Sequence, residues 1–332
     1  MGREDESRRR EGGWQLTTLD FETYRRALTG YCYRMLGSIH DADDVVQETL
    51  LRAWRGRDGF LGQACVKTWL FQIATNLCVD ASRKRRRMPM EFAGPFAPEI
   101  EPGDMLPNGA WIEPGRDDDL LPAGDDPADA VVRKDSVRLA LIGVLQTLPA
   151  RQRAVFILRD VLGWHAKEVA TLLGTTTDAV TSALARARAA ISRADIGTGA
   201  PPALDDPRTV SLLARYVDAF ERFDIDALVR LLSEDVAMSM PPFVMWFKGR
   251  DDIRAFHLGT GAHCIGSRLV PLCLNGSPAF AQYMSPDEDG KRHLWCLQVL
   301  AIRDGEIVHV HNFLDPAIFG RLRVPLQLDS SA

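Results

Sequence analysis

The sequence lacks any long apolar run. No stretch of its 332 residues approaches the roughly 20 consecutive apolar residues of a membrane-spanning helix. The N-terminal segment, Met1–Gly13, is charged and lacks the apolar core of a signal peptide. These absences argue against a membrane protein, and we expect the chain to be soluble and cytoplasmic.

Cysteine pairs at metal-ligand or redox spacing are also missing. The six cysteines are scattered, none forms a CxxC pair, and none stands at zinc-ligand spacing from a histidine. Cys32, Cys78 and Cys296 fall inside apolar runs, so buried free thiols are the simplest interpretation. We therefore predict no metal site and no cofactor.

An even distribution of charge is the third feature that the sequence lacks. The net charge of −5, taken as an average, argues weakly against a nucleic-acid partner. The basic block Arg83–Arg87 is separate, however, from the acidic region Glu101–Asp129. Local charge decides whether a surface binds a phosphate backbone, so nucleic acid stays a candidate partner.

The chain divides into segments of different composition, and its 332 residues are too many for one domain with a single hydrophobic core. Two helix-forming stretches flank a region rich in Pro, Gly and Asp, and a short Gly/Pro stretch precedes a last part with different periodicity. Frequent Pro and Gly break helices and leave little to bury. We expect a disordered N-terminus at 1–18, helical domains at 19–88 and 130–195, linkers at 89–129 and 196–204, and a C-terminal domain at 205–328.

The segment Asp41–Trp54 has two faces at helical spacing. The apolar face predicts burial of Val46, Leu50, Ala53 and Trp54. A second, mostly polar stripe is formed at spacings i, i+3, i+4 and i+7 by Asp44, Gln47, Glu48 and Leu51. On physical grounds alone, a solvated helix face is the default interpretation of such a stripe.

A second helix is predicted from Thr68 to Arg87. Its outward face is amidic and acidic in the middle and basic at its end, with Asn76, Asp80, Arg83, Lys84 and Arg87. Amides can read base edges and guanidinium groups can hold phosphates, which suits a nucleic-acid partner. The alternative is a basic helix end that serves the helix dipole and solubility.

The segment His165–Val180 has the spacing of a helix-turn-helix. Gly174 permits the left-handed backbone of a tight turn, and Thr175 with Asp178 forms a plausible capping box. The second helix would bury Val180 and expose hydroxyl and basic side chains suited to a major groove, namely Thr177, Thr181, Ser182, Arg186 and Arg188. An ordinary helical hairpin is the alternative.

The last part of the chain predicts an α+β domain. One long amphipathic helix, Val210–Leu232, precedes strand-like runs at 236–240, 268–274, 279–284, 294–303 and 307–313. Asn275-Gly276, Asp289-Gly290 and Asp304-Gly305 stand between the runs, as in hairpins. A curved antiparallel sheet on one helix gives a cone with an internal pocket.

Two histidines in this part could serve catalysis. His309 and His311 alternate with valines and so share a face, and Asp315 is near. An Asp and a His inside a cone can act as acid and base. A satisfied or solvent-facing pair is the simpler interpretation, and we predict no catalytic residues and no enzyme activity.

Taken together, these segments resemble the extracytoplasmic-function (ECF) group of the sigma-70 family. The resemblance rests on Asp41-Ala-Asp-Asp-Val-Val-Gln-Glu-Thr49, on the helix from Thr68 to Asp80 with its basic end, and on Leu148–Arg188. Trp111-Ile-Glu-Pro114 resembles a linker motif of members with a C-terminal extension. The last part resembles the SnoaL-like fold, so the implied architecture is multidomain: two all-α sigma domains and an α+β SnoaL-like cone.

The resemblance implies a promoter-specificity subunit of RNA polymerase. The polar stripe with its neighbour Asp43, thus Asp43, Asp44, Gln47, Glu48 and Leu51, would dock the beta-prime clamp helices of core polymerase. Asn76, Asp80, Arg83, Lys84 and Arg87 would meet the melted −10 element, and the loop Arg55–Val66 would capture a flipped base. Thr177, Thr181, Ser182, Arg186 and Arg188 would face the −35 duplex.

In the resembling sigma factors the C-terminal domain regulates in cis, by packing on the sigma domains or the linker. The Asp-Gly-Gly-Gly-Lys motif that some of them carry is absent, and Asn275–Ala279 and Asp289–Lys291 are the nearest stretches. The alternative function is a one-component helix-turn-helix regulator whose C-terminal pocket senses a ligand. Such a regulator has no need of the polar stripe on Asp41–Trp54.

Overall fold

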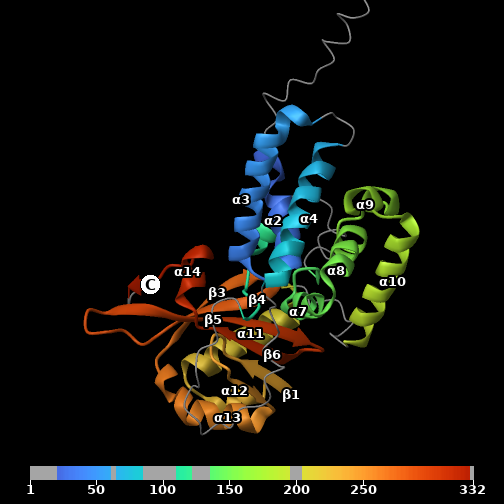
Figure 1. Ribbon diagram of the computed structural model, residues 1–332. Coiled ribbons are helices and arrows are strands. Elements are labelled where there is room, and N and C mark those ends of the chain that lie inside the picture. Colours follow the sequence, from blue (N-terminus) through green and yellow to red (C-terminus); the bar gives the residue numbers. More distant parts are fainter. Residues whose placement is uncertain (1–20, 61–64, 85–109, 122–134, 195–203, 330–332) are drawn as a thin grey trace, which may run out of the picture.

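Three parts of the chain pack against one another in the computed structural model. It describes residues 21–60, 65–84, 110–121, 135–194 and 204–329 (Figure 1). A first helical bundle (21–84) stands on one face of the sheet of the C-terminal domain (204–329), and a second helical bundle (135–194) lies beside the first. No helix in these ranges is long and apolar enough to cross a membrane.

The first bundle is built from α2 (Arg25–Leu36), α3 (Ile39–Gly56) and α4 (Val66–Lys84). Gly37 ends α2 in the left-handed conformation, with φ of 68°, and Ser38 caps α3 by accepting from the Asp41 amide. A short turn of helix, Phe21–Tyr24, precedes α2, and another, Arg57–Gly59, follows α3. The buried Tyr31 hydroxyl joins α2 to Thr75 of α4 at 2.7 Å.

The linker segment, residues 110–121, is packed into the protein. Trp111 is only 2% exposed, and Ile112 and Leu120 are also buried. The short helix α5 (Asp117–Leu120) lies against α2. We expect from the composition that the whole region 89–129 has little to bury. For residues 110–121 that expectation is wrong, because their few apolar side chains pack into the apolar cluster that includes α2. Residues 85–109 and 122–134 lie outside the described ranges.

The second bundle contains α7 (Leu139–Thr147), α8 (Ala150–Phe156), α9 (Ala166–Leu173) and α10 (Thr177–Arg193), with a π-helical turn at Ile157–Val161. Gly174 adopts the predicted left-handed turn, with φ of 61°. The cap of α10 is Thr176, which accepts from the Ala179 amide, and not Thr175 as predicted. Trp164, just before α9, packs on Phe71 of α4 with ring centroids 5.2 Å apart.

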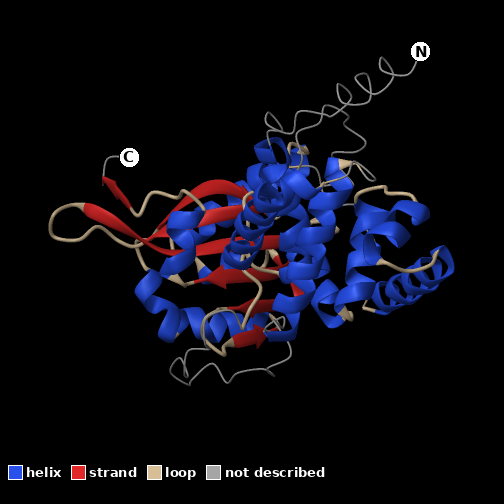
Figure 2. Ribbon diagram, turned by 45° about the horizontal axis from the view of Figure 1, so that its top comes forward, coloured by secondary structure: helices blue, strands red, loops and turns tan. Residues whose placement is uncertain are grey.

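The C-terminal domain is a seven-stranded sheet with helices on its concave face. Its strands are β1 (Leu232–Ser239), β2 (Trp246–Lys248), β3 (Arg268–Leu274), β4 (Ser277–Tyr283), β5 (Lys291–Arg303), β6 (Glu306–Phe313) and β7 (Gln327–Asp329). The order is β2-β1-β6-β5-β4-β3, and β7 pairs with β5. Figure 2 shows the β4–β5 hairpin projecting beyond the helices, with β7 beside it.

Two details of this domain differ from the prediction. The sheet is mixed, because β1 runs parallel to β6 while every other pair is antiparallel. The predicted long helix is divided into α11 (Pro207–Glu221) and α12 (Ile225–Val229), and Leu232 already belongs to β1. Phe223 between them has a φ of 55°, and Asp224 caps α12 by accepting from the Ala227 amide.

The two faces of the sheet bury different partners. The concave face packs on α11, α12 and α13 (Arg250–Leu258) in one apolar cluster. The opposite face contributes Ala281, Leu297 and Val299 to a second cluster, which is continuous with both helical bundles and includes α14 (Pro316–Arg321). Figure 1 shows α12 and α13 on one side of the sheet and α2–α4 on the other.

The linker segment packs closely against α2 at Gly30. A Cβ atom at this position would collide with the Leu120 carbonyl oxygen, which is backbone and cannot yield cheaply. We predict that Gly30→Ala destabilises linker docking by about 1–3 kcal/mol, the usual range for overpacking. Hydrogen exchange at residues 110–121 should accelerate.

Gly320→Ala in α14 is the matched control, because nothing lies within 4 Å of its added Cβ. It should leave exchange at residues 110–121 unchanged. Equal exchange in the Gly30→Ala variant and the parent protein would mean that α5 is not held against α2.

Candidate functional site

The polar stripe of α3 lies at the surface, and its neighbour Asp43 is engaged by the C-terminal domain. Asp44 and Gln47 are exposed, Glu48 pairs with Arg52 at 2.7 Å, and Leu51 is 41% exposed. Asp43 differs from the rest, because it forms an ion pair with Arg321 of α14. The C-terminal domain therefore covers one end of the stripe.

Trp54 does not face the core as predicted. Its side chain is 51% exposed and stacks under Arg57, whose guanidinium carbon lies 4.2 Å from the ring centroid. The residue lies at the edge of the apolar face near the end of α3, where stacking with Arg57 replaces core packing. The exposed apolar surface of α3 thus runs from Leu51 to Trp54.

The outward face of α4 carries the residues predicted to meet DNA. Asn76, Asp80, Arg83 and Lys84 are all exposed, and Arg83 pairs with Asp80 at 3.3 Å. Arg87 and residues 61–64 of the adjacent loop lie outside the described ranges. The structure therefore brings four of the five predicted residues onto one accessible helix face.

The predicted recognition helix is α10, and its five candidate residues are all exposed. Arg188 is already engaged, since its Nε and Nη2 atoms each donate to a carboxylate oxygen of Asp160 at 2.8 Å. This bidentate pair ties α10 to the turn after α8. Within the described part of the chain Arg186 has no such ion pair, and it is the cation on this face most available to a ligand.

The β3–β4 turn of the C-terminal domain is a site that the sequence did not reveal. Asn275 is fully buried with a φ of 54°, which the Asn-Gly hairpin turn requires. Its amide nitrogen donates to the Tyr33 hydroxyl at 2.7 Å and to the Val137 carbonyl at 2.6 Å. Its amide oxygen accepts from the Gly115 N–H at 2.8 Å.

We call this set, Asn275 with Tyr33, Gly115 and Val137, the junction. Tyr33 belongs to the first bundle, Gly115 to the linker segment, and Val137 to the start of the second bundle. One side chain of the C-terminal domain therefore contacts every other part of the described chain. The Tyr33 hydroxyl also donates to the Glu113 carbonyl at 2.8 Å, which connects the junction to the linker motif.

Acidic residues of the linker segment are also bound by the C-terminal domain. Asp117 accepts from the Gly276 amide at 2.7 Å and from the Cys273 thiol at 3.0 Å. Arg323 reaches Asp119 at 2.8 Å. Two of the described linker acids, Asp117 and Asp119, are therefore held by the C-terminal domain in this conformation.

Glu113 of the linker motif caps the helix that carries the polar stripe. Its buried carboxylate accepts from the Ser38 hydroxyl at 2.8 Å, from the Ile39 amide at 3.1 Å and from His40 Nδ1 at 3.0 Å. A negative charge is favourable at a helix N-terminus. The hydrogen bond to Glu113 raises the pKa of His40 above its ordinary value, against an opposing effect of partial burial.

Two buried arginines join the helical bundles. Arg34 of α2 donates to the Ser136 hydroxyl at 2.7 Å and to the Gly30 carbonyl at 2.6 Å, and burial lowers its pKa to about 10. Arg153 of α8 donates to the Met35 carbonyl and to the Gln146 amide oxygen. Arg34 donates to neutral oxygens, so its desolvated charge is only partly compensated.

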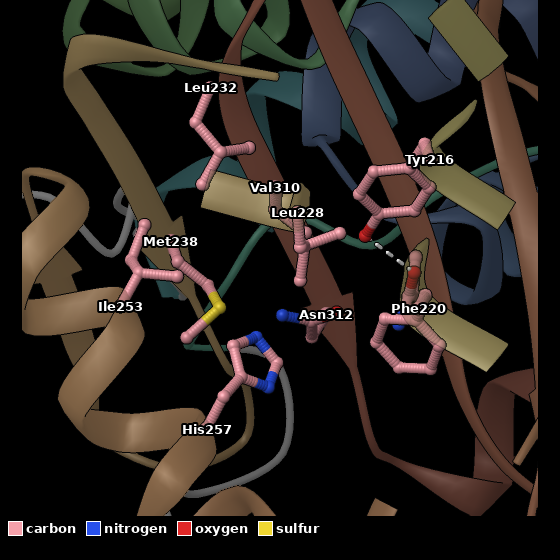
Figure 3. Close-up of a pocket in the computed structure, with 10 residues that line it drawn as sticks. Tyr216, Phe220, Leu228, Leu232, Met238, Ile253, His257, Val310 and Asn312 are labelled. Atoms are coloured by element: carbon pink, nitrogen blue, oxygen red, sulfur yellow. Dashed lines mark hydrogen bonds between the residues drawn. The ribbon is translucent and has the colours of Figure 1, made fainter. Parts of the chain in front are cut away.

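The histidines considered for catalysis lie away from the concave face. His309 and His311 share a face as predicted, with ring centroids 3.6 Å apart, and both rings are hydrogen-bonded to the Ser239 hydroxyl. The alternating neighbours Val310 and Asn312 line a small hollow between the sheet and the helices α11–α13 (Figure 3), so the histidine pair points to the opposite side of the sheet. Asp315 caps α14 by accepting from the Ala317 amide.

No cluster of three or more metal-ligating side chains occurs in the ranges that the structure describes. The predicted residues thus form three exposed helix faces, and the residues that hold these faces together were not predicted. The candidate functional site is this set of surfaces with the junction between them.

Comparisons with known proteins follow the same division of the chain. Three family models match it: sigma-70 region 2 at residues 21–88, sigma-70 region 4 at residues 138–191, and a SnoaL-like domain at residues 213–310. The ECF RNA polymerase sigma factor SigG of Mycobacterium tuberculosis is 44% identical over 318 residues, which cover 92% of this chain and 82% of SigG.

A solved structure resembles the whole arrangement. The crystal structure of the Mycobacterium tuberculosis extracytoplasmic function sigma factor SigJ superposes with a TM-score of 0.61 and 26% identity, covering 92% of this chain and 98% of SigJ. The probable ECF sigma factor SigI of the same organism is 27% identical over 322 residues, covering 92% of this chain and 96% of SigI.

The contrast between Arg186 and Arg188 gives a prediction for DNA binding. Arg186→Ala should weaken binding to a promoter duplex by about 1–3 kcal/mol if a bidentate base contact is lost. Arg188→Ala should cost less, because Asp160 already holds that guanidinium. Fluorescence anisotropy with protein, core polymerase and a duplex that the complex transcribes measures both. Unchanged affinity after Arg186→Ala would contradict the assigned face.

The Glu113–His40 pair predicts a pH dependence of linker docking. Because the His40 pKa is raised, the stabilisation of linker docking by the Glu113–His40 pair is fully present below about pH 6.5. It is lost as the pH rises through the raised pKa. The positive charge of Arg321 lowers the His40 pKa, and the negative charge of Asp315 raises it. Because His40 is partly exposed, we expect less than about 1 kcal/mol.

Hydrogen exchange of the Glu113 and Gly115 amides, corrected for the intrinsic pH effect, should be slower near pH 6 than near pH 8. His40→Gln should remove most of the difference. A pH difference that persists in this variant would assign the effect to another group.

Proposed function

The chain belongs to the ECF group of RNA polymerase sigma factors, and we propose that the conformation described here is its closed, polymerase-free state. Sigma factors of this group bind core RNA polymerase and direct promoter-specific initiation of transcription, and this is the function of the chain. The regulation by the C-terminal domain and the individual contact residues are our proposals.

The spacing of promoter elements supports the assignment of a closed state. The −10 and −35 elements lie about 25 base pairs apart, which is about 85 Å of B-form DNA at about 3.4 Å per base pair. The two bundles here touch, with Phe71 and Trp164 in ring contact. A small domain is about 30 Å across, so two touching bundles span about 60 Å, which is less than the separation of the two elements.

The single observation that carries the proposal is the junction. Asn275 contacts the first bundle, the linker segment and the second bundle through three side-chain hydrogen bonds. Separation of the bundles must break these bonds or strain them. The C-terminal domain therefore acts as an internal inhibitor that sets the free energy of opening.

We propose that α14 competes directly with core polymerase. Asp43, Asp44, Gln47, Glu48 and Leu51 form the proposed surface for the clamp helices. Arg321 forms an ion pair with Asp43. This ion pair has to break before the whole surface can bind the clamp helices. A basic side chain of this domain thus takes the place that we assign to the polymerase.

The DNA contacts that we propose follow from the two exposed helix faces. Asn76, Asp80, Arg83 and Lys84, with Arg87 beyond them, would meet the melted −10 strand, and the loop Arg55–Val66 would hold a flipped base. Thr177, Thr181, Ser182, Arg186 and Arg188 would meet the −35 duplex. These steps need binding and deformation of DNA but no covalent chemistry, and we expect no turnover by the C-terminal domain.

Asn275→Gly is the sharpest test of the closed state. Glycine keeps the left-handed turn but removes the three side-chain hydrogen bonds of the junction, each worth about 0.5–1.5 kcal/mol. Opening should become easier, so affinity for core polymerase should rise by about tenfold or more. Competition binding with purified core enzyme measures this.

Asp304→Gly is the matched control, since Asp304 takes the same conformation, with φ of 53°, in the exposed β5–β6 turn. It should bind core polymerase like the parent protein. If Asn275→Gly folds normally and binds with parental affinity, the junction does not control opening.

A further inference from the structure

Three arginines follow one flank of α11, the first helix of the C-terminal domain. Arg208, Arg215 and Arg222 are spaced seven residues apart, and all three are exposed. Arg222 directly follows the last residue of α11 and keeps a helical backbone. Seven residues are close to two turns of an α-helix, so the three side chains lie on the same flank, about 10 Å apart. We call this set the arginine row.

The C-terminal domain does not use the arginine row for its own packing. α11 packs on the sheet through a different side of the helix, which carries Tyr216. Among the residues that the structure describes, no ion pair or hydrogen bond engages the guanidinium groups of Arg208 and Arg215. Arg222 pairs with Asp218 at 3.5 Å, and the side chains are 70% and 67% exposed. Such an exposed pair is weak, so Arg222 can exchange Asp218 for another anion.

Two other acidic residues at the ends of α11 are directed to backbone amides. Asp206 caps the helix by accepting from the Arg208 and Thr209 amides, each at 3.1 Å. Glu221 accepts from the Leu269 amide of β3 at 2.9 Å. The arginine row therefore presents a net positive charge to solvent, which suits a polyanionic partner.

The arginine row is tethered to the helix that we assign to the −35 duplex. Arg193 ends α10, and Pro207 begins α11 only 14 positions later. A fully extended connection of this length spans at most about 50 Å, which is about 15 base pairs of duplex. While α10 lies on the −35 element, α11 stays within reach of the adjoining DNA even after the bundles have separated. The −10 element occupies the downstream side, so the flank left for α11 is upstream.

We propose that the arginine row binds the phosphate backbone of the DNA directly upstream of the −35 element. The proposal rests on the proposed contact between α10 and that element. Duplex DNA carries one negative charge per about 1.7 Å of its axis, so guanidinium groups about 10 Å apart meet phosphates in any sequence. The contact adds affinity without sequence preference. The C-terminal domain thus gains a second role, because it holds the promoter once the junction has opened.

Promoter duplexes of two lengths test the arginine row. Both derive from a promoter that the complex transcribes: one ends at the upstream edge of the −35 element, and one extends upstream by about 20 base pairs, beyond the reach of the tether. Full-length protein with core polymerase is titrated against each duplex at several salt concentrations. The double variant Arg208→Gln, Arg215→Gln should bind the extended duplex more weakly than the parent protein. Its slope of log affinity against log salt should be shallower by about 2, since each phosphate contact contributes about 0.9. On the short duplex the variant should match the parent.

The matched control is the double variant Arg254→Gln, Arg303→Gln, which removes two charges from arginines of the same domain that already form ion pairs. It should leave the slope unchanged on both duplexes. Lysine at positions 208 and 215 should keep the parental slope, because a phosphate contact needs the charge and not the planar fork. Arg186→Ala should weaken both duplexes alike, so a failure of the α10 assignment is measured separately.

An unchanged slope for the Arg208→Gln, Arg215→Gln variant on the extended duplex would overturn the proposal. An equal loss on both duplexes would also overturn it, because the row would then not contact upstream DNA. Binding of the same variant to core polymerase without DNA should equal that of the parent. Weaker binding there would assign the row to an acidic surface of the polymerase and would overturn the DNA contact.

Discussion

The hydrogen bonds of one asparagine amide connect the parts of this protein. Asn275 stands in a hairpin turn whose backbone suits few residue types, and its side chain reaches both helical bundles and the linker segment. These bonds are buried, so breaking any of them leaves a desolvated polar group unless water replaces the partner. The way the C-terminal domain is held against both bundles therefore depends on whether this turn stays in place.

The surfaces around the junction suit a state that can be released. Arg34 and Arg153 are buried between the bundles, and such desolvated charges contribute less stability than apolar packing would. The Glu113 carboxylate caps the N-terminus of α3, and the Asp117 carboxylate accepts from the β3–β4 turn of the C-terminal domain. The interface thus combines an apolar cluster shared with both bundles with polar contacts that water or a competing partner can replace.

Local structure followed from the sequence, and long-range contacts did not. The left-handed turn at Gly174, the Asn-Gly and Asp-Gly turns, and the shared face of His309 and His311 all depend on neighbours within a few residues, and they are confirmed. Asn275 and Tyr33 are 242 residues apart, and no periodicity couples such positions. The ion pairs Arg321–Asp43 and Arg188–Asp160 were missed for the same reason. The assignments of polymerase and DNA contacts stay predictions.

The distance between the bundles before and after polymerase binding tests the closed state most directly. Spin labels at the exposed positions Gln72 of α4 and Ala185 of α10, with Cys65 replaced by serine, would report it by pulsed electron resonance. A closed polymerase-free state predicts one short distance for the free protein and a lengthening by tens of ångströms with core enzyme and promoter. The same distance in the free and the bound protein would contradict it.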